Sequence, residues 1–412
     1  MLRRIAAHSL LLLTGEGFSR GLTFVTTVVL ARVLGPGAFG VLAFAQALLG
    51  YALLVGDGGL ATHGVRAVAN APAEARAAWT GLATVRLGLS TAALAIAMLA
   101  AWALPAEPLV RTVALVTLAA ALPTALLPDW TLRGLQRMGR AAVLNAVPAA
   151  VTLVLVLACV HAPGDVPLAA LARTAGSAAA AVLGMVWMRR WPFTRAAQQE
   201  GAAWRSAHGG TVLMRAGATI LAANLAVLVY NSADQLLLFA LADERAVGLY
   251  GGAYRILQLP FAAFYALTAA SLPALSAAMR DDPAGARRTA ARLEWLGLAA
   301  GAALAAALLW VRAPLLQALY GPGYAAAAPA LGVLALAIPL DFAVSVRGLA
   351  AIAAGRERTN LVLAAIGAAA NVAANLVLIP RAGIVGAAWA TVGTYVVLYL
   401  LYRAFLDPGE KR

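Results

Sequence analysis

Residues 230–259 read YNSADQLLLFALADERAVGLYGGAYRILQL, and this stretch decides the fold. It leaves one apolar run, crosses a charged turn at residues 243–245 and enters a second apolar run. Residues 34–47, LGPGAFGVLAFAQA, have the same design, with Gly40 in the place of Gly248. The two copies predict that each half of the chain begins with a hairpin of long apolar segments.

The composition points to a membrane protein. The chain has 412 residues, of which 63% are hydrophobic and only 12% are charged, whereas soluble domains average about 45–50% apolar and about 25% charged residues. So much apolar surface cannot be hidden in soluble cores, which favours a polytopic membrane protein. The net charge of +14 is scattered between the apolar runs. Nucleic-acid binding is therefore not expected, and the basic residues are better explained by orientation in the membrane.

Apolar runs of about 20 residues, the length that spans a bilayer, predict twelve transmembrane helices. We expect an all-α protein with two parallel six-helix lobes in a V-shaped arrangement, at residues 1–187 and 209–412, and a cytoplasmic linker at 188–208. In parallel repeats the shared site lies between the lobes. The predicted spans are 9–34, 39–55, 78–104, 109–127, 141–161, 168–187, 209–241, 246–278, 290–311, 325–353, 360–379 and 384–405.

The basic residues orient these spans. With a cytoplasmic N-terminus, 20 of the 31 basic residues fall in inside loops and 5 at outside ends. This bias predicts a multi-pass membrane protein with both termini cytoplasmic. After the eighth span, Asp281-Asp282-Pro283 combines an N-cap residue with a proline in the first helical turn. It predicts a surface helix from Ala284 to Glu294.

No pattern of catalytic or metal-binding residues stands out. Residues 35–40 match G-x-G-x-x-G, but they lie between two long apolar runs, so we interpret them as a turn between spans and not as a nucleotide site. The four histidines are scattered without metal-ligand spacing. Ser-x-x-Lys, Gly-x-Ser-x-Gly and His-Glu-x-x-His are not found. We therefore predict that the protein is not an enzyme and needs no cofactor or metal.

Charges inside the predicted spans are the candidate functional residues. Arg20 lies about 16 Å into the first span at 1.5 Å per residue, and Arg255 is similarly deep in the eighth. An arginine at a span centre costs about 2.5–3.5 kcal/mol on insertion scales, so such residues usually face a wet cavity or a partner. We predict a cationic substrate-binding cavity and a small set of acidic partners. The cavity residues are Arg20, Arg255, Arg215 and Arg86, and the possible charge partners are Glu16, Asp234 and Asp341.

Four further polar positions within the spans are less distinctive. Arg173 and Arg347 are shallower, so their side chains can reach the membrane surface. Asn371 and Asn375 are spaced i and i+4, which favours a role as polar contacts between helices.

Four stretches resemble bacterial oligosaccharide flippases of the polysaccharide biosynthesis family, in the multidrug/oligosaccharidyl-lipid/polysaccharide exporter superfamily. They are LARVLGP with FG at 30–40, DGGL at 57–60, Asp234 with VGLY at 247–250, and NVAANLVLIPRAGIVGAAWAT at 371–391. The resemblance spans the whole chain. It implies a flippase that moves an isoprenoid diphosphate-linked oligosaccharide from the cytoplasmic to the outer leaflet by alternating access, for cell-surface polysaccharide biosynthesis. Related lipid II flippases have two further C-terminal helices, so the oligosaccharide branch is expected.

Two alternatives remain open. A cation-coupled multidrug exporter of the same superfamily would favour carboxylates over arginines in its cavity. A membrane-embedded glycosyltransferase or polysaccharide ligase would need catalytic carboxylates or a histidine on a sizeable outside loop, and the predicted outside loops are short. The partners expected of a flippase are the lipid-linked oligosaccharide, membrane lipids and other polysaccharide assembly proteins.

Overall fold

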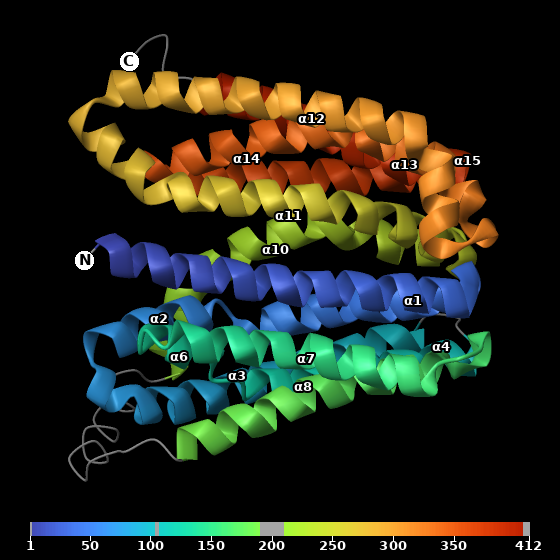
Figure 1. Cartoon of the computed structure of the whole chain (residues 1–412), viewed down its shortest axis with the longest axis horizontal. Coiled ribbons are helices and arrows are strands. Elements are labelled where there is room, and N and C mark those ends of the chain that lie inside the picture. Colours follow the sequence, from blue (N-terminus) through green and yellow to red (C-terminus); the bar gives the residue numbers. More distant parts are fainter. Residues whose placement is uncertain (1, 104–106, 190–209, 407–412) are drawn as a thin grey trace. The chain divides into compact units, whose positions relative to one another are not determined.

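The computed structural model describes residues 2–103, 107–189 and 210–406 (Figure 1). Within these ranges all regular elements are helices, as predicted. The α-helices are α1 (Leu2–Asp57), α2 (Leu60–Asn70), α3 (Ala75–Ala103), α4 (Pro108–Leu118), α5 (Ala121–Ala125), α6 (Asp129–Gly134), α7 (Met138–Cys159), α8 (Val166–Arg189), α10 (Gly210–Leu241), α11 (Glu244–Asp281), α12 (Pro283–Tyr320), α13 (Ala328–Ala335), α14 (Ala337–Ala353) and α15 (Glu357–Leu406). Short 3-10 helices are η1 (Pro72–Glu74), η2 (Pro163–Asp165) and η3 (Pro322–Ala327).

The helices are long and apolar enough to account for the predicted spans. Among the described residues, nine helices could cross a membrane, or ten when Pro322–Ala335 and Ala337–Ala353, which meet at 40°, form one span. Two of the ten are broken by a glycine with non-helical torsions, at Gly35 (φ 69°) in α1 and at Gly383 (φ 51°) in α15. Divided at these glycines, the ten helices correspond to the twelve predicted spans. The break between the first two spans thus falls at Gly35, the first residue of the G-x-G-x-x-G stretch, and residues 36–40 begin the next helical segment.

The structure adds short helices to the predicted pattern. The fourth predicted span is divided into α4 and α5, and the amphipathic α2 and the short α6 lie in segments that we expected to be loops. On α2, buried Leu60, Gly64 and Val68 recur every four residues and pack toward Trp130 of α6. A helix start was correctly predicted after Asp282, whose carboxylate accepts a hydrogen bond from Gly285 N at 2.9 Å. It continues without interruption into the ninth span.

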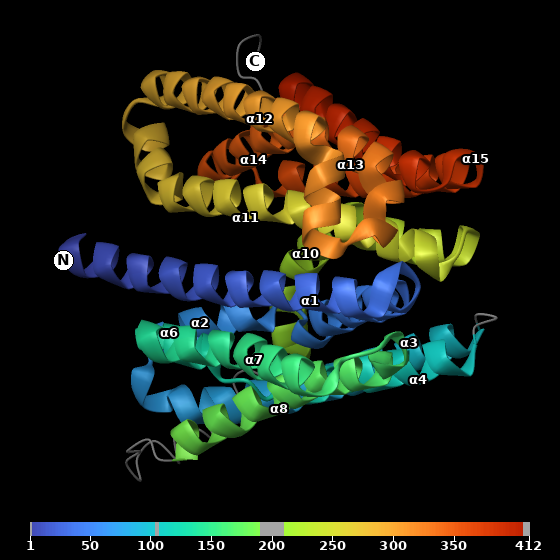
Figure 2. The ribbon, with the colours of Figure 1, turned by 45° about the vertical axis from the view of Figure 1, so that its right-hand side comes forward.

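Contacts divide the chain into two compact units, which we describe separately. Unit 1 comprises residues 1–34 and 44–225, and unit 2 comprises 35–43 and 226–412. In unit 1, α7 and α8 run side by side in both views (Figures 1 and 2). They approach closely because Gly176 of α8 has no side chain: a Cβ there would lie 2.6 Å from the Pro148 carbonyl oxygen of α7. Such small residues are common where membrane helices pack.

Unit 2 has α12 packed along α14, with α11 and α15 beside them (Figure 1). Gly301 of α12 meets Pro339 of α14, where an added Cβ would lie 2.6 Å from the proline Cα. Gly40 and Gly248, the two glycines matched in the sequence, also face each other here. A Cβ on Gly40 would clash with the Glu244 carbonyl, and one on Gly248 with the Pro36 carbonyl. The repeated hairpin starts are thus packed backbone to backbone.

Candidate functional site

Unit 1 contains a polar cavity of about 190 Å³ between α1, α7 and α8. Hydroxyl and amide side chains dominate its lining, and among the described lining residues Arg173 is charged and none is a carboxylate. The lining residues are Ser19, Thr23, Thr26, Thr27, Leu30, Gln46, Asn145, Pro148, Ala149, Thr152, Ala169, Arg173 and Ser177. Such a surface can exchange hydrogen bonds with a polyhydroxylated or anionic ligand.

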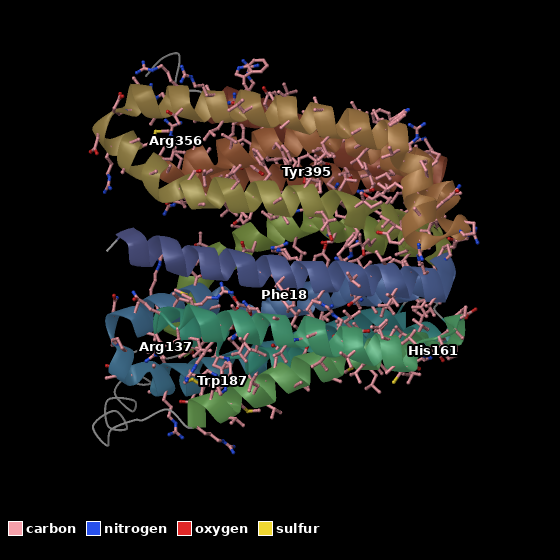
Figure 3. The ribbon with its side chains drawn as sticks, viewed as in Figure 1. Phe18, Arg137, His161, Trp187, Arg356 and Tyr395 are labelled. Carbon is pink, nitrogen blue, oxygen red and sulfur yellow. The ribbon has the colours of Figure 1, made fainter. Side chains whose placement is uncertain are left out.

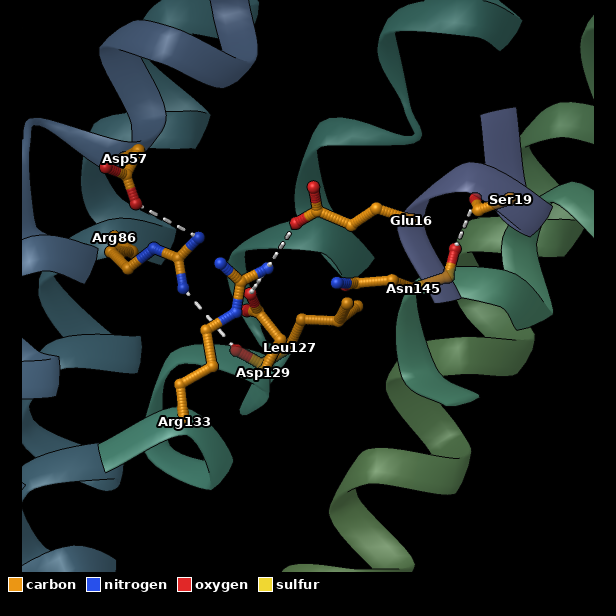
Figure 4. Close-up of polar contacts among 8 residues, drawn as sticks. All are labelled: Glu16, Ser19, Asp57, Arg86, Leu127, Asp129, Arg133 and Asn145. Carbon is orange, nitrogen blue, oxygen red and sulfur yellow. Dashed lines mark hydrogen bonds and ion pairs between the residues drawn. The ribbon is translucent and has the colours of Figure 1, made fainter. Parts of the chain in front are cut away.

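The threonines of this cavity are fixed by their own helices. Thr23, Thr26 and Thr27 each donate to the carbonyl four residues earlier on α1, at 2.8–2.9 Å. Thr152 of α7 does the same at 2.6 Å. Each hydroxyl donates its proton to this hydrogen bond, and its oxygen lone pairs can still accept. The lining therefore offers acceptors to a ligand with O–H or N–H groups. Ser19 ties α1 to α7 through the Asn145 carbonyl at 2.9 Å (Figure 4).

Arg20 and Glu16 lie on α1 close in sequence to Ser19, but neither belongs to the described lining of this cavity. The Arg20 side chain is exposed, one residue from Ser19 in the lining. Glu16 is one turn earlier, and its carboxylate lies 3.8 Å from the guanidinium of Arg133, which also lies 3.8 Å from Asp129 (Figure 4). Glu16, which was predicted as a charge partner for the cavity arginines, is thus paired with Arg133 in the last turn of α6.

Arg86 has a structural partner. It is 7% exposed on α3, and its guanidinium lies 3.3 Å from the Asp57 carboxylate at the end of α1 and 3.5 Å from the Leu127 carbonyl (Figure 4). A buried guanidinium needs such compensation, because leaving it without a partner is strongly unfavourable. The side chain of Arg215 lies outside the described part of the structure.

Unit 2 contains a buried polar cluster around Asp234 of α10, which is 1% exposed. Its carboxylate accepts hydrogen bonds from Tyr250 of α11 at 2.5 Å, and from Thr391 and Asn375 of α15 at 2.8 and 2.6 Å. Asn375 also donates to Asn371 Oδ1 at 3.1 Å. The two asparagines therefore connect helices, as predicted. Neutral donors surround this carboxylate and join α10, α11 and both parts of α15, with Asn375 before the glycine break at Gly383 and Thr391 after it.

The remaining predicted residues of unit 2 lie near this cluster. Arg255 is half-buried on α11 and donates to Gln258 Oε1 at 2.8 Å. Asp341 is half-buried on α14 and lies beside Tyr395 of α15. The Tyr395 hydroxyl donates to Asn231 Oδ1 at 3.2 Å. Asp234 and Asp341 thus meet tyrosine and amide groups from neighbouring helices.

Two arginines outside the predicted site line cavities. Arg173 lines the cavity of unit 1, and Arg347 lines a second cavity in unit 2. The unit 1 cavity could have been found from Ser19, Thr23 and Thr26, because hydroxyls spaced four and three residues apart form a polar stripe on one helix face. Arg347 gives no such signal, since its neighbours come from other helices.

Comparison with solved structures defines the class of fold. The lipid II flippase MurJ in an inward closed conformation has a TM-score of 0.73 and 13% identity, covering 96% of this chain and 87% of that one. An inward-facing multidrug resistance MATE family transporter of the MOP superfamily has a TM-score of 0.70 and 17% identity, covering 93% and 94%. A MOP superfamily transporter from Pyrococcus furiosus has a TM-score of 0.55 and 15% identity, covering 97% and 94%. The fold is that of helical transporters and flippases.

The family follows from the sequence itself. The profile described as polysaccharide biosynthesis protein matches residues 5–279, and the chain belongs to this family. No curated protein sequence shows significant similarity to the chain. The chain is therefore a multi-pass membrane protein of the polysaccharide biosynthesis family with a transporter fold.

Proposed function

We propose that this protein is a flippase that moves an isoprenoid diphosphate-linked oligosaccharide from the cytoplasmic to the outer leaflet. Family membership supports a role in making a surface polysaccharide. The observation that carries the choice of substrate is the lining of the unit 1 cavity, where hydroxyls, amides and Arg173 occur without a carboxylate. These groups suit sugar hydroxyls and phosphates.

The proposed mechanism is alternating access by two lobes, residues 1–187 and 209–412, in the inner membrane with both termini cytoplasmic. Arg20 has a specific role in this proposal. Its side chain is exposed deep in a predicted span, where exposure to lipid is unfavourable, so it faces water and a phosphate group. Arg255 has the same role in the second lobe, and Arg215 adds positive charge, whereas the charge of Arg86 is offset by the Asp57 carboxylate. The lipid tail stays in the bilayer, and other assembly proteins receive the flipped product.

A matched pair of variants tests the cavity. Thr23→Val with Thr27→Val removes two lining hydroxyls and keeps the side-chain shape. Thr84→Val is the control, because Thr84 makes the same bond to the carbonyl four residues earlier, at 2.9 Å, on an exposed part of α3. We expect the double variant to reduce surface polysaccharide and to leave lipid-linked oligosaccharide on the cytoplasmic leaflet. Equal effects of the cavity and control variants would contradict the assignment.

The second candidate is a cation-coupled multidrug exporter. The MATE likeness and the buried Asp234 carboxylate favour it, because a carboxylate surrounded by neutral donors can take up a proton or a cation. A gene deletion separates the two candidates. A flippase deletion strain accumulates cytoplasmic lipid-linked oligosaccharide with normal efflux of cationic dyes. Lost dye efflux with normal polysaccharide would select the exporter. The likeness of the fold to transporters favours these two transport functions over a glycosyltransferase or ligase.

A further inference from the structure

The second cavity, of about 440 Å³, lies in unit 2 where α11 turns into α12, against the end of α14. Among the described residues, its lining includes one carboxylate, that of Glu294, and the guanidinium groups of Arg280, Arg287, Arg347 and Arg356. The lining therefore has three more positive than negative groups. Arg356 marks this end of the unit in Figure 3. These turns are on the side where the distribution of basic residues predicts the cytoplasm.

The cavity has a buried charged base, an apolar wall and a basic rim. At the base, Arg347 Nε donates to Glu294 Oε1 at 2.9 Å, with the two side chains 13% and 9% exposed. The wall is formed by alanines and Val346. Arg280, Arg287 and Arg356 are exposed at the rim. An anion with an attached apolar body matches this arrangement, because phosphate oxygens can bond to guanidinium groups while alkyl chains contact the wall.

An exposed tryptophan places the cavity at the membrane surface. Trp295 follows Glu294 on α12 and is 72% exposed, and the next residue, Leu296, is 66% exposed. Tryptophan concentrates where the bilayer meets water, at the level of the lipid headgroups. A cavity beside Trp295 is therefore accessible to lipids at the depth of their headgroups. This position favours a lipid headgroup over a soluble anion as the ligand.

We propose that this cavity binds the phosphate of a net-anionic phospholipid headgroup from the leaflet at that side of the membrane. The rim arginines bond to the phosphate oxygens, and the Arg347–Glu294 pair fixes α14 to α12 beneath the headgroup. The bound lipid ties together the α11–α12 turn and the start of α15. This site is separate from the polar cavity of unit 1, and its ligand is not transported.

Binding to the purified full chain in detergent tests the proposal, with phosphatidylglycerol carrying a fluorescent tail as the probe. We expect saturable binding that Arg280→Gln with Arg287→Gln weakens at least tenfold. The control is Arg288→Gln with Arg292→Gln, which removes the same charge from exposed positions of α12 that do not line the cavity; it should change the affinity less than twofold. Ala291→Phe, which fills the cavity at an exposed lining position and keeps every charge, should also weaken binding.

Competition identifies the source of the phosphate. Phosphatidylcholine with the same tails and inorganic phosphate should compete poorly. Equal loss in both double variants would mean general surface charge and would overturn the proposal. Displacement by inorganic phosphate as effective as by the lipid would assign the cavity to a free anion. Binding of an isoprenoid diphosphate without binding of phosphatidylglycerol would assign it to a transported substrate. Either result would refute the phospholipid site.

Discussion

Asp234 shows how single residues organise unit 2. Its buried carboxylate holds three donors from two other helices, so each donor loses a partner if the carboxylate is removed. A buried polar group left without a partner costs about 1–3 kcal/mol. Asp234 therefore contributes to the packing of α10 against α11 and α15, whether or not it also binds a coupling cation.

Two threonines of α15 test this cluster. Thr391→Val removes a donor to Asp234, whereas Thr394→Val removes a hydroxyl whose bond is to the Ala390 carbonyl of its own helix, at 2.8 Å. Both side chains are buried. We expect Thr391→Val to lower the free energy of unfolding by about 1–2 kcal/mol more than Thr394→Val. Thermal unfolding in detergent measures the difference, and equal melting temperatures would argue against a stabilising network.

Arg20 is the second test at this scale. Cysteine in place of Arg20, in a Cys159→Ala background, should react with membrane-impermeant thiol reagents, because the proposal places this side chain in water. Cys159 must be removed because it is an exposed thiol. Arg20→Ala should abolish export without reducing expression, and Arg20→Lys should restore it partly, since an ammonium replaces a planar guanidinium. A cysteine here that resists labelling would place Arg20 outside the aqueous cavity.

Whole elements in this protein meet through glycines. The clearest case is α11 against residues 35–43, where Gly248 and Gly40 bring two backbones together. Each glycine leaves room for a carbonyl of the opposite segment, so neither can gain a methyl group without separating the helices. The repeat seen in the sequence thus has a packing role, because both copies supply the small residue at the same contact.

Two glycines of α11 give a matched comparison. Gly248→Ala directs a Cβ into the Pro36 carbonyl, whereas a Cβ on Gly251 would lie 3.6 Å from Ala43, an ordinary van der Waals distance. Alanine in a helix is about 1 kcal/mol more favourable than glycine. We expect Gly251→Ala to be neutral or stabilising and Gly248→Ala to destabilise the protein by several kcal/mol. If both variants unfold at the same temperature, the close contact has no energetic role.

At the scale of the whole molecule, the direction of the spans is the property to test. In unit 1, Arg137 and Trp187 lie at one end and His161 at the other (Figure 3), as expected if α7 and α8 cross the membrane in opposite directions. The distribution of basic residues predicts that the end with Arg137 faces the cytoplasm.

Reporter fusions determine the topology. Fusions after Arg195 and after Arg412 should report the cytoplasm, and a fusion at Asp165 should report the outside. Activities of paired cytoplasmic and periplasmic reporters, normalised to expression, provide the measurement. An external signal after Arg195 would mean an odd number of spans in the first half and would contradict two lobes of six.

The sequence by itself determined the membrane class and the helical spans, because hydropathy over 20 residues is a local property. It also indicated the family and the interhelical role of Asn371 and Asn375. Only the tertiary structure decided the partners of the charges. Arg86 meets Asp57, Arg133 meets Glu16, and Arg347 meets Glu294 across 29, 117 and 53 positions of the chain. Helical periodicity predicts neighbours three or four residues apart, whereas these contacts depend on which helix packs beside which, and at what depth.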